Sequence, residues 1–402
     1  MTRTKRITVL SFGVVVVTIL AASLPHFGRD SQRIQLTAKC REAHQRQRWD
    51  ELQSLAEPWS KWDSQNGEPW MFLGHAASGR RDWSTAVACY SRVPEPHPGF
   101  VPAMIQVSDM SFEHLNEPLK GVDACHRILK VDSRAAGAQK QLIWFYTMTL
   151  QRAKLLKQID SAVKAKKEPR ESYAYYFLVD SFRSKFAVQL NQRWHESAPD
   201  EEVFQVARAL HLPNEDADSP DSATTAADGS ETSPAAGRSK RELLEKLLIR
   251  FPHNIELLAY LAQDRLNSGD VAGAAALLSQ VPAAAEQDSR FWLIQGWLHE
   301  SNNNVDEAAT AYRHALELHP MDWNTLNRLA VVERRRQKID EVQRLTKLVE
   351  RAYSLRKQLR ELPAIEKITP EILHDLASLA HDCGDQKIGP ALRRRFETAN
   401  PQ

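Results

Sequence analysis

Cysteine is scarce in this chain, and the few cysteines lie far apart. Cys40, Cys89, Cys125 and Cys383 form no CxxC pair. This spacing excludes a zinc ribbon, a thioredoxin-type motif and a haem attachment site. Free cysteines of this kind are commonly small buried side chains between helices, although one disulfide is possible if the chain is exported.

The sequence also lacks the short motifs on which common enzyme classes depend. It has no GxSxG, no GxxxxGK followed by Ser or Thr, no HExxH and no GxGxxG. The best metal candidates are His374, His381 and Cys383, but the two histidines would lie ~10 Å apart along a helix. We therefore expect a protein that is not an enzyme and has neither a cofactor nor a metal site.

Neither sign of charge dominates, and the net charge of +2 is too small to indicate nucleic acid binding. Residues 213–237 contain six acidic residues and no lysine or arginine, so the rest of the chain carries about +8. The same segment is rich in Ser, Thr, Ala and Pro and has no large apolar side chain. It cannot bury enough surface to offset its ordering entropy, so we expect a disordered acidic linker at residues 213–238.

Long apolar runs are absent except near the N-terminus. Arg3, Lys5 and Arg6 precede residues 7–24, which are mostly apolar and close to the minimum length of a membrane span. This pattern predicts a transmembrane signal anchor at residues 1–28, with a cytoplasmic N-terminus and an exported, periplasmic body. The alternative is a cleaved signal peptide and a secreted protein, which the small residues at 21–23 also fit.

What the sequence does contain is a repeated spacing of Trp, Gly, Ala, Tyr and Pro. These residue types recur in one register in two distant segments: Trp70, Gly74, Ala86, Tyr90 and Pro98, then Trp292, Gly296, Ala308, Tyr312 and Pro320. Small residues at the glycine and alanine positions let two antiparallel helices approach closely. The proline ends the second helix because it has no backbone N–H to donate.

This spacing resembles the tetratricopeptide (TPR) repeat, a helix–turn–helix unit of about 34 residues. The resemblance is strong at residues 67–100 and 255–322, fair at 323–356, and weaker over the rest of 34–402. It implies an all-α fold, a right-handed solenoid of antiparallel helix pairs, because a single pair leaves its apolar face exposed and needs neighbours. We expect repeats at residues 33–212 and again at 239–402.

The segment 172–183 is unusually rich in aromatic side chains. It predicts one helix whose aromatics form either an inter-helix core or the wall of a binding site. The core interpretation is favoured, since a helix that is apolar nearly all round is usually buried.

The resemblance also implies a function, because TPR proteins receive peptides or protein surfaces in a concave groove lined by first helices. Helical geometry then assigns the groove-facing positions. They are Tyr260, Gln263, Asn267, Arg290, Ile294, Trp297, Asn327, Arg328 and Arg335. Arginine suits carboxylates and tryptophan offers rigid contact area, so we expect a non-enzymatic scaffold for an acidic or amide-rich protein segment. The alternative for residues 334–336 is a solvated basic face paired with Glu333 and Asp340.

One known mode of TPR recognition does not fit. Some TPR proteins hold a C-terminal carboxylate with an Asn, Lys and Arg clamp, and Arg328 stands at such a position. Ile294 occupies the corresponding place in the preceding repeat, where the clamp needs a polar side chain. Two other functions stay open: a structural protein that assembles with itself, and an accessory subunit of a membrane-associated enzyme.

Overall fold

The computed structural model describes residues 29–213 and 235–399, and the regular elements in these ranges are all helices. The predicted all-α fold is confirmed. The predicted transmembrane helix at 7–24 and nearly all of the predicted linker lie outside the described residues. Within the described ranges, every helix is too short or too polar to cross a membrane. The chain divides into two compact units, residues 1–131 and 132–402.

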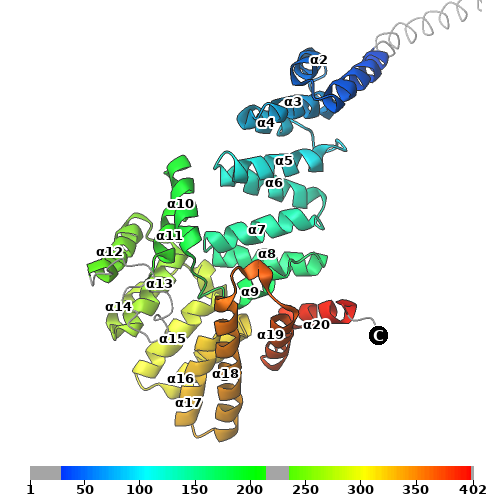
Figure 1. The fold of residues 1–402 in the computed structure, drawn as a ribbon. Coiled ribbons are helices and arrows are strands. Elements are labelled where there is room, and N and C mark those ends of the chain that lie inside the picture. The colour runs from blue at the N-terminus through cyan, green and yellow to red at the C-terminus, as the bar shows by residue number, and fades with distance from the viewer. Residues whose placement is uncertain (1–28, 214–234, 400–402) are drawn as a thin grey trace, which may run out of the picture. The chain divides into compact units, whose positions relative to one another are not determined.

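In the first unit, each helix packs against the next one along the chain (Figure 1). A helix at 29–45 is followed by α2 (Trp49–Trp62), α3 (Gly67–Gly79), α4 (Trp83–Tyr90), α5 (Phe100–Glu113) and α6 (Pro118–Val131). The starts of α3 and α4 are set by side-chain caps, since Asn66 and Asp82 each accept a hydrogen bond from a backbone N–H of the first turn. The helix at 29–45 packs against α2, so a helix pair is present here although the repeat spacing is weaker than at residues 67–100.

The glycines of the repeated spacing lie where two helices come closest. A Cβ atom at Gly74 would stand 2.5 Å from the ring of Tyr90, and one at Gly296 would stand 2.5 Å from the ring of Tyr312. Both tyrosines are almost fully buried. Glycine is required at these two positions because the tyrosine ring of the second helix occupies the space of its side chain.

The tryptophans of the repeated spacing also play matching roles. The indole N–H of Trp70 donates to the carbonyl of Ser64 at 2.9 Å, and that of Trp292 donates to the carbonyl of Glu286 at 2.8 Å. Each tryptophan thus ties the first helix of its pair to the backbone just before that helix. The two segments that agree in sequence agree in these contacts as well.

The second unit is also built mainly from neighbouring pairs (Figure 1). Its helices are α7 (Ala136–Met148), α8 (Arg152–Ala165), α9 (Glu171–Phe177), α10 (Lys185–Ser197), α11 (Glu202–His211), α12 (Ala235–Arg250), α13 (Ile255–Asn267), α14 (Val271–Leu278), α15 (Ser289–Ser301), α16 (Val305–Leu318), α17 (Trp323–Arg335), α18 (Ile339–Glu361), α19 (Pro370–Asp382) and α20 (Ile388–Ala399). Short 3-10 turns lie at Ala283–Gln287 and Ile365–Lys367. The helix α18 is a single element of 23 residues, so it extends well past the length of its neighbour α17, which has 13.

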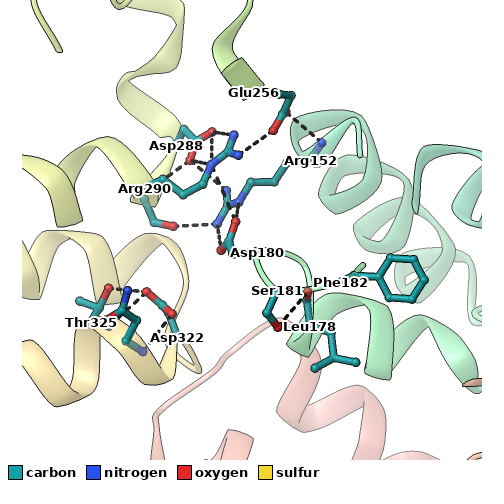
Figure 2. A network of polar contacts seen from close by, with 12 residues as sticks. Arg152, Leu178, Asp180, Ser181, Phe182, Glu256, Asp288, Arg290, Asp322 and Thr325 are labelled. Atoms are coloured by element: carbon teal, nitrogen blue, oxygen red, sulfur yellow. Dashed lines mark hydrogen bonds and ion pairs between the residues drawn. The ribbon is translucent and has the colours of Figure 1, made fainter. Parts of the chain in front are cut away.

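The aromatic helix is shorter than predicted. It ends at Phe177 instead of Arg183, because the chain turns twice there: the amide of Leu178 bonds the carbonyl of Ala174, and the amide of Phe182 bonds the carbonyl of Leu178. The side chains of residues 173–177 are buried, as the core interpretation predicts, whereas Phe182 lies past the end of the helix and is half-buried. The turn after α9 brings Asp180 against α8 (Figure 2).

The four cysteines are free thiols. Cys40 and Cys125 are buried, and burial raises the pKa of each thiol to about 11. The Cys125 sulfur lies 3.2 Å from the hydroxyl of Ser108, between α5 and α6. These thiols therefore have the character of small packing side chains and not of reactive nucleophiles.

Candidate partner-binding pocket

A pocket of about 560 Å³ opens in the second unit, a size typical of ligand-binding clefts. Three successive first helices contribute to it: α13, α15 and the start of α17. Its polar and aromatic lining includes Tyr260, Gln263, Asn267, Trp323 and Asn324. The spacings of three and four residues place Tyr260, Gln263 and Asn267 on one face of α13, as their sequence positions require.

Of the predicted groove residues, Tyr260, Gln263, Asn267 and Arg290 line this pocket. The buried side chain of Leu293 lies beside them on α15. The structure therefore brings together the predicted residues of α13 with one from α15, but it does not bring the whole predicted set to one place.

The role expected for Arg290 needs correction. Its guanidinium donates to Glu256 at 2.6 Å and to Asp288 at 2.6 Å (Figure 2). Burial opposes the charge, but these carboxylates outweigh it and raise the pKa of Arg290 well above its usual value. With both of its hydrogen-bonding edges in use, Arg290 is a structural residue at the pocket floor and is not free to bind a carboxylate from outside.

Arg290 belongs to a larger buried network, whose second centre is Arg152. This arginine is only 4% exposed and donates to Asp180 at 2.7 Å and to the hydroxyl of Ser289 at 2.7 Å. It also lies 3.3 Å from a carboxylate oxygen of Asp288. Burial would raise the pKa of Asp180 and Asp288, but the two arginines outweigh it and hold both values below the usual range.

This network could not be predicted from the sequence, because its members lie far apart along the chain. The only local signal is Asp288, a capping residue that accepts the N–H of Arg290 at 3.1 Å at the start of α15. No spacing rule links it to Arg152 or Asp180. Together these residues fix α8, the turn after α9, and the starts of α13 and α15 around one point.

The sequence predicts that Ile294 faces the groove, and this prediction is wrong. It has no exposed surface and lies in an apolar cluster with Leu258, Ala262 and Phe291. The reason is that α13 and α15 pack against each other, so a side chain on the face between them becomes buried. Ile294 therefore cannot line a groove in this structure.

The remaining predicted residues lie outside the pocket. The guanidinium of Arg328 stacks on the ring of Trp297, 3.4 Å from its centre, and pairs with Glu300 at 3.6 Å. Asn327 is exposed on α17, and Arg335 donates a hydrogen bond to Asn303.

The basic run at 334–336 is partly an ion-paired surface. Arg336 pairs with Glu333 at 2.9 Å and with Asp306 at 2.8 Å. Arg334 and Arg335 are exposed.

Three arginines that the sequence analysis did not select line the pocket: Arg183, Arg356 and Arg360. Arg183 follows the unpredicted turn after α9. Arg356 and Arg360 lie on the extended part of α18, a second helix, whereas the repeat pattern directs attention to first helices only. The side chains of the extension could have been found only by knowing that α18 continues past the length of an ordinary repeat helix.

Comparison with known families decides the nature of this part of the chain. One tetratricopeptide repeat model matches residues 241–298 and another matches residues 295–341. Residues 241–341 therefore match tetratricopeptide repeats. A TPR repeat-containing protein of Methanocaldococcus jannaschii is 28% identical over 106 residues, which are 24% of this chain. The chain spans only 19% of the length of that relative.

Two solved structures are similar to this chain. A tetratricopeptide repeat protein from Parabacteroides merdae is 11% identical, with a TM-score of 0.29, over 75% of this chain and 99% of that one. Yeast Tom70 is 14% identical, with a TM-score of 0.29, over 92% of this chain and 77% of that one.

Proposed function

We propose that this TPR protein is a non-enzymatic scaffold that binds a segment of a partner protein in the pocket lined by α13, α15 and α17. The observation that carries the proposal is the convergence of three successive first helices on one hollow. Tyr260 offers rigid aromatic contact, while Gln263 and Asn267 offer amide donors and acceptors for a peptide backbone. An acidic or amide-rich segment fits best, because arginines also line the pocket.

The test is to purify the full chain with its bound partner and identify that partner by mass spectrometry. The double variant Tyr260→Ala with Asn267→Ala should lose the partner while its melting temperature changes little. Asn327→Ala is the matched control, since it removes an exposed amide from α17 outside the pocket. If the double variant retains as much partner per chain as the unchanged protein does, the pocket is not the binding site.

We further propose that residues 7–24 anchor the chain in a membrane and that its body is exported. The length of the apolar run and the basic residues ahead of it support this placement. Fractionation of cells should find the protein in the membrane with residues 1–28 still attached. A soluble exported protein that begins near Leu24 would instead establish a cleaved signal peptide.

A further inference from the structure

A second pocket, of about 630 Å³, adjoins the first one. Ser181, Arg183 and Arg360 line both pockets, so the two share a wall. The lining of the second pocket includes the apolar side chains of Trp144, Met148, Phe182, Phe186, Leu362 and Ile365. Its one carboxylate, that of Glu366, accepts a hydrogen bond from the hydroxyl of Tyr175 at 3.1 Å. Phe186 is 53% exposed, a large apolar side chain left open to solvent at this site.

Three of the four arginines that line the first pocket, all except Arg290, are not held by any carboxylate that the structure describes. Among the described residues, no carboxylate lies within ion-pairing distance of Arg183, Arg356 or Arg360. Arg183 donates to the carbonyl of Phe182 at 2.6 Å. Arg356 stacks 4.8 Å from the centre of the Trp323 ring, and its Nε is buried with no acceptor in the described part of the chain.

The acidic side chains that line the same pocket are already engaged elsewhere. Asp180 accepts from Arg152 at 2.7 Å, and Glu256 accepts from Arg290 at 2.6 Å. Asp322 caps α17, accepting the N–H groups of Asn324 and Thr325 at 3.2 and 3.3 Å. These carboxylates are held by other partners and form no ion pair with Arg183, Arg356 or Arg360, so the three guanidinium groups keep donors available for a carboxylate of a partner.

The local electrostatics agree with this geometry. Burial lowers the pKa of Lys240 to about 8, and the positive charge of Arg183 lowers it further in the same direction. Burial also lowers the pKa of Arg356, with the neighbouring charge of Arg360 as the next cause. Positive side chains therefore lie close together here, although their mutual repulsion destabilises the folded state. Such an arrangement is common at binding sites.

We propose that the two pockets together receive a partner segment in which an acidic side chain lies close to a large apolar one. The carboxylate pairs with Arg356 and Arg360, whose planar forks match its geometry. The apolar side chain enters the second pocket and covers Phe186. This inference rests on the proposed scaffold function and adds to it the chemistry of the partner, since a small anion alone would have no use for the apolar pocket.

The test uses an array of synthetic peptides that carry glutamate and phenylalanine at varied spacing. Matched peptides carry glutamine for glutamate or alanine for phenylalanine. The full chain should bind the glutamate–phenylalanine peptides about tenfold or more tightly than either matched set, because a charge-assisted hydrogen bond and a filled apolar pocket are each worth about that factor. Raising the salt concentration should reduce the preference for glutamate.

The variant R356Q with R360Q should abolish the preference for glutamate and keep the preference for phenylalanine. Lys357→Gln is the matched control, because it removes one positive charge from an exposed position of the same helix. Phe186→Ser should do the reverse, weakening selection for phenylalanine only. Thermal melting of each variant establishes that the unit is folded.

Three outcomes distinguish this inference from the function on which it rests. Loss of the glutamate preference in the arginine variant but not in the lysine control supports it. Peptides that bind regardless of charge and are lost with the Tyr260→Ala and Asn267→Ala substitutions would leave the scaffold function standing and overturn the inference. If the chain binds no peptide of any set, the inference is overturned, and the scaffold function is decided by purification of the bound partner.

Discussion

At the scale of single residues, Arg152 shows how much one buried charge can depend on its partners. It is surrounded by Asp180, Asp288 and Ser289, and removal of Asp180 takes away two charge-assisted hydrogen bonds while Asp288 still balances the charge of Arg152. Asp180→Ala should therefore lower the free energy of unfolding by about 1.5–3 kcal/mol, measured by urea denaturation.

The control for this prediction is an exposed ion pair on the same helix as Arg152. Asp160 pairs with Lys164 at 2.6 Å near the surface of α8, and Asp160→Ala should cost less than about 0.5 kcal/mol. Equal losses from the two substitutions would mean that the buried network contributes no more than an ordinary surface pair.

Glycines give a second prediction at this scale. Gly296→Ala should destabilise the protein by about 1–3 kcal/mol, because the new methyl group meets the Tyr312 ring at 2.5 Å. Gly137→Ala, on α7, meets nothing within 4 Å and should be neutral or stabilising by about 0.5–1 kcal/mol. Thermal melting of the two variants checks the contrast, and a similar effect at both positions would contradict the contact geometry.

At the scale of elements, the junction of α7, α10 and α11 contains a histidine that must stay neutral. The Nε2 of His211 lies 3.0 Å from the carbonyl oxygen of Met148, so it carries the hydrogen and donates. The Nδ1 accepts the backbone N–H of Ser184 at 3.3 Å. Burial, followed by the charge of Arg183, lowers the pKa of His211 to about 4.

This arrangement predicts acid sensitivity with a definite sign. In the unfolded chain His211 takes up a proton near pH 6.5, whereas in the folded chain it does so only near pH 4. Between these values the unfolded state binds more protons, so the free energy of unfolding falls as the pH falls, by up to about 1.4 kcal/mol per unit.

The measurement is urea denaturation at several pH values between 6.5 and 4. His211→Gln should flatten part of the slope seen in the wild type, and the exposed His253→Gln should leave it unchanged. Part of the slope should persist in His211→Gln, because burial and the charge of Arg152 also lower the pKa of His319. An unchanged slope in His211→Gln would rule out this histidine as a source.

Sequence predicted the helix pairs well wherever the pattern is local. The spacing from Gly296 to Tyr312 encodes a contact within one pair, and capping residues such as Asp82 mark helix starts directly. The prediction was wrong where contacts between elements determine the structure. The helix α9 ends early because the chain turns toward Arg152, and Ile294 is buried because α13 packs on α15. A helical wheel shows which residues share a face but not which face a neighbour covers.

At the scale of the whole molecule, the pocket and its wall lie entirely within residues 132–402. A fragment of these residues should therefore fold and bind the glutamate–phenylalanine peptides as the full chain does. Circular dichroism and peptide affinity check this expectation. A fragment that is helical but does not bind would show that residues 1–131 contribute to recognition.

Only some residues of the candidate site could be predicted from the sequence, and the reason lies in the architecture of the whole chain. The repeat spacing identified Tyr260, Gln263 and Asn267, whose helix follows the family pattern. It could not identify Arg183 or Arg360, because a turn outside the repeats and an extended second helix bring them to the pocket. The proposed selectivity thus rests on the parts that depart from the repeat.

The Arg152 network has a consequence for how the chain folds. A stack of helix pairs held by neighbour contacts can start folding anywhere and spread from pair to pair. Here the backbone of Arg152 bonds Glu256 across 104 residues, and its guanidinium bonds Ser289 across 137. Closing loops of that length is slow. The entropy cost of closure must be met before the buried charges can pair and stabilise the fold. The second unit should therefore reach its native state in one late cooperative step, after its individual helix pairs have formed.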